Sequence, residues 1–267
     1  MPFAGVPDGH VATPPAIARM AGDRPLRPVW QNELGGLTFE VGRGAGRYFI
    51  KWAPKGSGLN LAREAVRLTW AVDFTPVPAL MDQGADEAGS WIVTAALPGG
   101  TAVGDRWKAD PGLAVAAIGR GLRAFHDSLP IESCPFSWSA EDRLAEARFR
   151  ALAGDLVPAF WHPIHRSLDV AKVLDLLAMV PPIDRLVVCH GDACAPNTLL
   201  TEDGHWSGHV DLGDLGIGDR WADLAIATWS TQWNYGPGWE RPLLDAYGVV
   251  LDRKRMRYYR LLWDVGP

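Results

Sequence analysis

The sequence changes its pattern near residue 100, and this change limits the folds that the chain can adopt. Before that point, two β-rich runs at residues 37–41 and 48–52 flank a glycine-rich segment, residues 42–46. Runs of this kind around a glycine-rich turn predict a β-hairpin. A helical stretch at residues 59–72 follows, and residues 91–94 resemble a further strand. We therefore predict a small sheet with one helix in the first hundred residues.

Beyond Gly100 the pattern is mostly helical, with one short strand and one hairpin. We predict helices at residues 113–128, 140–153, 168–179, 221–233, 243–247 and 253–263. Residues 186–189 are typical of a strand, and residues 198–200 and 209–210 of a hairpin about Asp203-Gly204. Residues 1–28 are predicted to form a loosely ordered arm with a short helix at 16–21. The predicted fold is therefore α+β, with an N-terminal lobe at residues 1–96 and a larger, mostly helical lobe at residues 97–267.

Composition excludes several classes of protein. The chain has 26 lysines and arginines against 31 aspartates and glutamates, for a net charge of −5. Nucleic-acid binding usually needs clustered excess cations, so we expect no nucleic-acid partner. No apolar run reaches the roughly 18 residues that span a bilayer, so we expect no membrane role. Three cysteines and the absence of a basic, apolar leader favour a cytoplasmic protein, which we expect to be a monomer or a weak dimer.

Three side chains in the second lobe fit the chemistry of phosphoryl transfer. Asp192 and Asn197 lie in the segment His190–Asn197, and Asp211 follows the short predicted hairpin. Phosphoryl transfer needs one carboxylate to orient the attacking hydroxyl and accept its proton, and oxygen ligands to hold Mg²⁺ on the nucleotide phosphates. Asp192 would be the base, and Asn197 and Asp211 the metal ligands. The alternative is that Asp192 and Asn197 only stabilise a turn. The segment His190–Asn197 is followed, after a short predicted hairpin, by Asp211, and this order favours catalysis.

These motifs resemble those of the aminoglycoside phosphotransferase family, whose members are relatives of protein kinases. The resemblance rests on His190–Asn197, on Val210-Asp211-Leu212-Gly213 and on residues 219–225. It is strong over residues 186–228, is looser over the first lobe, and covers most of the chain. The first of these segments looks most like the streptomycin 3''-phosphotransferase branch. The resemblance implies a two-lobed, protein-kinase-like fold that binds ATP, or GTP, between its lobes together with Mg²⁺.

The resemblance also assigns residues of the first lobe to the nucleotide. Lys51 lies where the family's strand lysine contacts the α- and β-phosphates, and Glu64 on the following helix would hold it in place. Taken alone, the two would be interpreted as solvent-exposed charges, but their position upstream of Asp192 favours the pair. The adenine is expected to bond the backbone near Thr94 and Ala96.

Two glycine-rich segments compete for the role of the phosphate-binding loop. Residues 42–46 look like a phosphate cradle, but the predicted hairpin makes them its far turn. We therefore expect the loop at residues 32–37, where Gly35 and Gly36 would let backbone N–H groups approach phosphate oxygens.

Several polar residues around the motif receive plainer interpretations. The resemblance implies that His190 organises the catalytic loop and leaves the proton transfer to Asp192. Asp214 stands where many members of the family carry an arginine. Arg220 is a possible substitute for that cation, but we expect it to pair with Asp223 as a structural bridge.

The acceptor end has the fewest signals. The stretch from Trp229 to Trp233 is almost free of charge, which argues against a polyamine sugar of the kanamycin kind. Asp264 lies where the family's tail contacts substrate and is a candidate for a guanidinium contact, with an ordinary solvated tail residue as the equal alternative. His162 and His165 form an H-x-x-H pair that we expect on a loop or helix surface.

We therefore predict an ATP-dependent enzyme that phosphorylates a hydroxyl of a small-molecule aminoglycoside, foremost the 3''-hydroxyl of streptomycin, and so confers antibiotic resistance. One alternative is a kinase of the same superfamily that acts on another antibiotic or a metabolite alcohol. The other is a nucleotide-binding pseudokinase. The presence of Lys51, Asp192, Asn197 and Asp211 argues against the pseudokinase.

Overall fold

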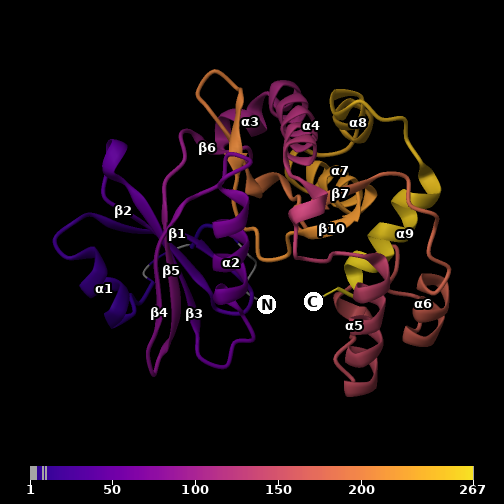
Figure 1. Ribbon diagram of the computed structural model, residues 1–267, viewed down its shortest axis with the longest axis horizontal. Coiled ribbons are helices and arrows are strands. Elements are labelled where there is room, and N and C mark those ends of the chain that lie inside the picture. Colours follow the sequence, from indigo (N-terminus) through magenta and orange to yellow (C-terminus); the bar gives the residue numbers. More distant parts are fainter. Residues whose placement is uncertain (1–4, 8, 10, 267) are drawn as a thin grey trace. The chain divides into compact units, whose positions relative to one another are not determined.

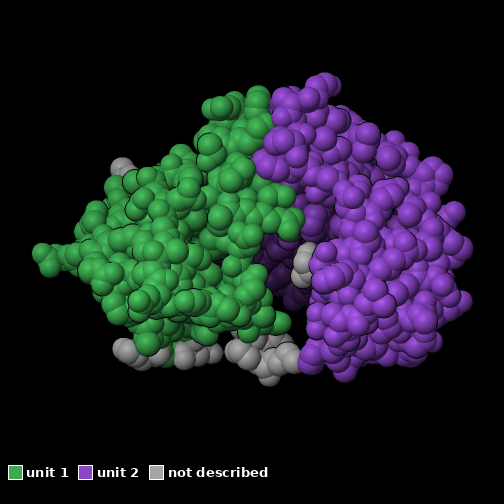
Figure 2. Space-filling view, turned by 60° about the horizontal axis from the view of Figure 1, so that its bottom comes forward, with its two compact units in different colours: residues 1–98 green, residues 99–267 purple. Residues whose placement is uncertain are grey.

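The computed structural model describes residues 5–7, 9 and 11–266. The chain divides into two compact units, unit 1 at residues 1–98 and unit 2 at residues 99–267 (Figure 2). The expected boundary, between residues 96 and 97, lies two residues earlier. Each unit is built around its own buried apolar side chains.

Unit 1 is a five-stranded antiparallel sheet in the order β1-β2-β3-β5-β4 (Figure 1). The strands are β1 (Leu26–Gln31), β2 (Leu37–Val41), β3 (Tyr48–Pro54), β4 (Leu80–Ala85) and β5 (Gly89–Ala95). The predicted hairpin is confirmed as β2 and β3, where Phe39 pairs with Ile50. Leu37, Phe39 and Val41 alternate with less buried residues along β2, as a strand with one buried face requires.

The edges of this sheet are β1, of which the strand-like pattern from about residue 29 shows only the end, and β4, which the sequence did not reveal. Residues 26–28 of β1 fell in the predicted arm, and Pro28 is tolerated there because an edge strand can lack one ladder donor. Most of β4 is exposed or half-exposed, so its residues show no apolar alternation. Strands without a buried face leave little signal in the sequence.

Two α-helices lie in the described part of unit 1. Helix α1 (Pro15–Ala21) confirms the predicted short helix, and its Ile17 packs with the buried side chains of β2 and β3. Helix α2 (Leu61–Ala71) begins at Asn60, whose side chain accepts a hydrogen bond from the Arg63 N–H at 3.0 Å. Such a cap satisfies one of the free amide groups at the start of a helix. Helix α2 carries Glu64 among its buried residues.

Unit 2 is mostly helical and contains two small sheets. Its helices are α3 (Asp105–Ala109), α4 (Pro111–Ser128), α5 (Ala140–Ala153), α6 (Val170–Leu177), α7 (Trp221–Tyr235), α8 (Glu240–Tyr247) and α9 (Arg253–Asp264). Strand β7 (Leu186–Cys189) pairs with β10 (Gly216–Asp219), and β8 (Thr198–Leu200) lies between β6 (Gly100–Thr101) and β9 (Trp206–His209). The α+β fold and the six predicted helices of this lobe are thus confirmed.

Helix α7 is the centre of unit 2. Every residue from Trp221 to Thr231 is buried, which explains why its pattern is apolar on all sides. The helix packs against α8, α9, β10 and the short 3₁₀ turn η4 (Ala195–Asn197). No helix among the described residues is long and apolar enough to cross a membrane.

Candidate active site

The predicted catalytic loop connects β7 to β8. It leaves β7 after Cys189, passes through Asp192 and the turn η4, and enters β8 directly after Asn197. The hairpin β8–β9 then returns the chain, and the Val210 N–H donates to the Asn197 carbonyl at 3.0 Å. Asp211 follows at once, so the structure brings Asp192, Asn197 and Asp211 together, as the sequence predicts.

The two carboxylate oxygens of Asp192 have different surroundings. Oδ2 accepts a hydrogen bond from the Asn197 amide nitrogen Nδ2 at 3.0 Å. Oδ1 is buried and has no hydrogen-bond partner within the described part of the chain. Burial raises the pKa of Asp192, and the nearby Asp211 carboxylate raises it further, while the hydrogen bond from Asn197 opposes the change. An unpartnered oxygen of raised basicity is suited to accept a proton.

Asn197 and Asp211 present oxygen atoms beside that carboxylate. The Asn197 amide nitrogen donates to both the carbonyl oxygen and the carboxylate of Asp192, so its amide oxygen remains available. Asp211 has a φ of 67° and is the only non-glycine residue in the described ranges with positive φ. Backbone strain of this kind collects at functional sites. Amide and carboxylate oxygens are the ligands that Mg²⁺ prefers, so these two residues fit the expected metal.

His190 holds the catalytic loop with its ring, and it is fully buried. Its Nδ1 accepts a hydrogen bond from the Asp192 N–H at 3.2 Å, and its Nε2 lies 3.0 Å from the Val210 carbonyl. Both bonds are satisfied by the neutral imidazole that carries its proton on Nε2. The ring therefore ties the loop that carries Asp192 to the strand that leads into Asp211, and both nitrogens are used in this way.

The carboxylate of Asp223 on α7 holds the same loop by its backbone. Its Oδ2 accepts from the His190 N–H at 2.6 Å, and its Oδ1 accepts from the Gly191 N–H at 3.0 Å. Oδ2 also lies 2.9 Å from Nε2 of His126, whose Nδ1 lies 2.8 Å from the Tyr247 hydroxyl. Burial alone would raise the pKa of Asp223, but the hydrogen bonds from His126 and from the His190 N–H together outweigh it and the pKa is lowered. The carboxylate is therefore charged and fully bonded.

The expected pair between Arg220 and Asp223 is wrong. Arg220, the residue before α7, donates instead to Asp184 at 2.7 Å, whereas Asp223 lies in the first turn of the helix. Asp223 faces inward and is completely buried, so a guanidinium at the surface cannot reach it. The sequence showed the spacing of the two residues but not the direction in which each points.

Gly191 is the one position of the loop that no other residue can fill. Its φ is +89°, which side chains other than glycine rarely adopt. A Cβ atom built there would lie 2.3 Å from the Asp214 carbonyl oxygen. The close approach brings the catalytic loop against the segment that follows Asp211.

In unit 1, the predicted pair of Lys51 and Glu64 forms. Nζ of Lys51 on β3 lies 2.8 Å and 2.9 Å from the two carboxylate oxygens of Glu64 on α2. The Glu64 side chain is 6% exposed and that of Lys51 is 23% exposed, so the pair is largely shielded from solvent. A bond to both oxygens fixes the ammonium in one place.

The segment at residues 32–36 connects β1 to β2, which places the predicted phosphate loop between the first two strands. The N–H groups of Leu34 and Gly36 donate to the Asn32 side chain, at 3.1 Å and 2.7 Å, and that of Gly35 donates to the Asn32 carbonyl at 3.1 Å. These amide groups are therefore used inside the loop, and a phosphate oxygen would have to replace Asn32 as their acceptor.

The two residues expected near the adenine differ in their backbone surroundings. Thr94 lies within β5 and pairs with Phe49 on one side and Leu80 on the other. Ala96 is the first residue beyond β5. Because a strand with neighbours on both sides uses its amide groups in the sheet, Ala96 is better placed than Thr94 to offer its backbone to a ligand.

The residues predicted to contact the acceptor lie in one aromatic cluster of unit 2. The rings of Trp229 and Trp233 on α7 are 5.7 Å apart. His162 stacks on Trp229 at 4.3 Å with an interplanar angle of 20°. His165 Nδ1 bonds to a carboxylate oxygen of Asp264, and the other oxygen accepts the His162 N–H at 3.0 Å. His162 and His165, which the sequence suggested were surface residues, therefore connect the three predicted ones.

This aromatic cluster is joined to the catalytic loop through α7. The Ala195 N–H of the loop donates to the Ser230 hydroxyl at 2.8 Å, and Ser230 follows Trp229 directly. Trp229 is buried, whereas Trp233 is 49% exposed. The H-x-x-H spacing drew attention to the two histidines, but it could not identify their partner Asp264, which lies about a hundred residues later in the chain.

Comparisons with known proteins agree with this geometry. The profile of the phosphotransferase enzyme family matches residues 31–259. An aminoglycoside 3'-phosphotransferase of Streptomyces fradiae is 36% identical over 222 residues, which cover 79% of this chain and 81% of the relative. The streptomycin 3''-kinase of Streptomyces griseus is 32% identical over 265 residues, with 94% and 95% covered.

Solved structures give the same result. The aminoglycoside phosphotransferase APH(3'')-Id of Streptomyces rimosus has a TM-score of 0.77 at 27% identity, and the match covers 93% of this chain and 95% of that one. The same protein is known in complex with ADP and streptomycin, with a TM-score of 0.73. The family match spans both units and includes Lys51, Asp192, Asn197 and Asp211. The chain is therefore a transferase that belongs to the phosphotransferase enzyme family.

Proposed function

We propose that this protein transfers the γ-phosphoryl group of ATP to a hydroxyl of an aminoglycoside, and that the acceptor is the 3''-hydroxyl of streptomycin. The observation that carries the proposal is the buried, unpartnered Oδ1 of Asp192 beside a carboxylate and an amide oxygen. A base next to oxygen ligands for a hard cation is the arrangement that phosphoryl transfer to an alcohol needs. The names of the relatives supply the class of acceptor.

In this mechanism Asp192 orients the attacking hydroxyl. The Asn197 amide holds Oδ2, so Oδ1 is left to accept the hydroxyl proton as the phosphoryl group is transferred. The raised pKa of Asp192 makes it a better acceptor than an ordinary aspartate. The transition state of phosphoryl transfer is loose, so most of the rate comes from positioning and from neutralising charge.

The oxygens of Asn197 and Asp211 are the groups that would hold Mg²⁺. The ion, when bound, neutralises the charge that develops on the nucleotide phosphates. Asn197 is oriented for this task because its NH₂ group is used by Asp192. The strained backbone at Asp211 aims that carboxylate without the freedom of an ordinary loop residue.

The charges of unit 1 are assigned to the nucleotide. Lys51, held by Glu64, binds the α- and β-phosphates, and Gly35 and Gly36 approach them with their backbone once Asn32 is displaced as an acceptor. The backbone beyond β5, at Ala96, bonds the adenine. We assign ATP as the nucleotide, because the similar structure of APH(3'')-Id was solved with ADP.

Two observations favour streptomycin as the acceptor. The match to the streptomycin 3''-kinase extends over 94% of the chain, against 79% for the Streptomyces fradiae enzyme. The segment from Trp229 to Trp233 has no charged side chain for the amines of a kanamycin-type sugar. Asp264 could bind a guanidinium group, which would have to share that carboxylate with His165.

A second candidate is the 3'-hydroxyl of a kanamycin-type aminoglycoside. It is favoured by the higher identity, 36%, to an aminoglycoside 3'-phosphotransferase. Release of ADP from ATP, measured with streptomycin and kanamycin side by side, distinguishes the two. We expect turnover with streptomycin and a product whose phosphate is placed on the 3'' position by NMR. Turnover with kanamycin alone would replace the first candidate by the second, and turnover with neither would refute both.

A further inference from the structure

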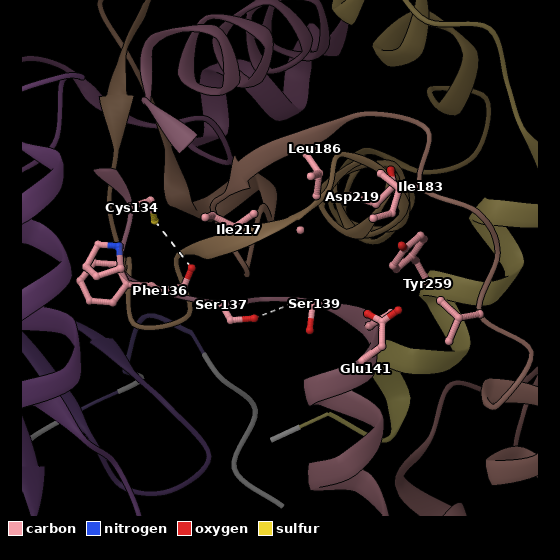
Figure 3. Close-up of a pocket in the computed structure, with 14 residues that line it drawn as sticks. Cys134, Phe136, Ser137, Ser139, Glu141, Ile183, Leu186, Ile217, Asp219 and Tyr259 are labelled. Carbon is pink, nitrogen blue, oxygen red and sulfur yellow. Dashed lines mark hydrogen bonds between the residues drawn. The ribbon is translucent and has the colours of Figure 1, made fainter. Parts of the chain in front are cut away.

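Unit 2 contains a cavity of about 350 Å³ that the proposed reaction does not use (Figure 3). It is lined by the segment before α5, the start of α5, the segment between α6 and β7, strands β7 and β10, and α9. None of its lining residues lies between His190 and Asp211. A volume of this size is at the lower end of the range found for small-molecule sites.

The walls of the cavity are mostly apolar. Phe136, Ile183, Leu186 and Ile217 all line it, and they come from four separate segments of the chain (Figure 3). Ile183 is 54% exposed and Leu186 is 42% exposed, so apolar surface remains open to solvent at the mouth. Such surface is stabilised when an apolar ligand covers it.

A tyrosine hydroxyl is one of the polar groups that line the cavity without a hydrogen bond to the described residues. The chain has five tyrosines, and the hydroxyls of Tyr48, Tyr235, Tyr247 and Tyr258 all hydrogen-bond within the protein. The hydroxyl of Tyr259 has no such partner in the described part of the chain, although the residue is only 2% exposed. Because Tyr259 lines the cavity and its hydroxyl has no partner within the protein, that hydroxyl is available to a polar group of a ligand.

Charge at the cavity indicates the kind of polar group that fits. Glu141, in the first turn of α5, lines the cavity and makes no ion pair or hydrogen bond among the described residues. In the view of Figure 3, Glu141 and Tyr259 lie on the same side and Phe136 lies on the other. Burial raises the pKa of Tyr259, so its hydroxyl stays neutral and can accept a hydrogen bond from a cation.

We propose that this cavity binds a small aromatic or alicyclic amine. The ring of the ligand would lie against Phe136, Ile217 and Leu186, and its ammonium group would reach the Tyr259 hydroxyl and the Glu141 carboxylate. Apolar walls with a small number of convergent polar groups are the usual composition of a small-molecule site. The site is separate from the catalytic loop and does not depend on which acceptor the enzyme phosphorylates.

The test uses the full-length protein and 2-phenylethylammonium as the probe, with binding followed by calorimetry and by ligand-observed NMR. We expect saturable binding that Tyr259→Phe weakens about 2- to 12-fold, the effect of one hydrogen bond. Glu141→Gln should weaken it about 2- to 5-fold, as one exposed charge pair would. Tyr258→Phe is the matched control, because its hydroxyl bonds the Leu177 carbonyl away from the cavity, and it should leave binding unchanged.

A second pair of variants tests the location. Ile183→Trp places a larger side chain at the mouth and should abolish probe binding, whereas Val250→Trp, at a position that is 87% exposed and does not line the cavity, should not. The proposal is overturned if the wild-type protein shows no saturable binding, which would mean that the cavity holds only solvent. It is also overturned if Tyr259→Phe and Ile183→Trp bind like wild type, or if 3-phenylpropanoate, an anion, binds as tightly as the amine.

Discussion

Replacing Asp223 by asparagine should uncouple the catalytic loop from α7 while leaving the rest of the loop's sequence intact. The carboxylate accepts the backbone N–H groups of His190 and Gly191 on different oxygens, and Oδ2 also bonds His126. An asparagine can keep its oxygen where Oδ2 lies and so retain two of the three bonds. Its NH₂ group then faces the Gly191 N–H, and two donors oppose one another at 3.0 Å.

The size of the effect follows from this count. One buried N–H loses its acceptor, which costs about 1–3 kcal/mol of unfolding free energy. For a protein of this size, that loss lowers the melting temperature by roughly 2–12 °C. Gly191 precedes Asp192, so the base loses the support of its neighbour's backbone. A misplacement of about 1 Å at the reacting group costs about 100-fold in rate, and we expect kcat to fall by about 10- to 100-fold.

Thermal unfolding followed by circular dichroism gives the stability change, and ADP release at a temperature where the variant is folded gives kcat. Asp219→Asn is the matched control, because Asp219 is also buried and accepts two backbone N–H groups, those of Asp184 and Trp221. We expect it to lose similar stability but to retain kcat. The reasoning is refuted if folded Asp223→Asn has the kcat of the wild type, or if Asp219→Asn loses as much kcat as Asp223→Asn.

Three further predictions follow from the site. Gly191→Ala forces a side chain into a φ of +89° and against the Asp214 carbonyl, and should cost at least about 2 kcal/mol in chemical denaturation; stability equal to wild type would contradict this. Lys51→Met should lower kcat/KM for ATP about 10- to 100-fold, whereas the exposed Lys55→Met should not. We expect Asp192→Asn to be more stable than the wild type at pH 7. A carboxyl group whose pKa is raised in the folded protein stabilises the fold while it is protonated, and this stability is lost as the pH rises through the folded-state pKa. Denaturation at pH 3 and at pH 7 should therefore show the gain in stability at pH 7 alone.

Local patterns predicted the elements that carry the site. The hairpin of β2 and β3 was visible because its glycine-rich turn lies between alternating apolar runs, and the hairpin of β8 and β9 because of Asp203-Gly204. These two hairpins determine where Lys51 and Asp211 lie, so the spacing of these residues in the sequence already predicted their positions in the fold. Strand β4 and the first half of β1, which the sequence did not show, have no fully buried face, and β10 contains two glycines and pairs with β7 only through the tertiary fold.

Contacts between distant segments were beyond the reach of the sequence. The spacing of Arg220 and Asp223 suggested a pair on one helix face, because residues three apart are neighbours there. The helix is buried at Asp223, and that residue instead meets the backbone 33 residues earlier in the chain. In the same way, His165 and Asp264 are 99 residues apart, and only the packing of α9 brings them together.

The central claim is that Asp192 accepts the proton of an aminoglycoside hydroxyl during phosphoryl transfer from ATP. Its most direct test is the steady-state release of ADP with Mg²⁺-ATP and streptomycin, for the wild type and for Asp192→Asn, with ATP affinity measured in parallel. The account predicts turnover by the wild type, unchanged ATP affinity in the variant, and a kcat lower by about 10²–10⁴-fold. A variant that binds ATP and turns over at nearly the wild-type rate would contradict it.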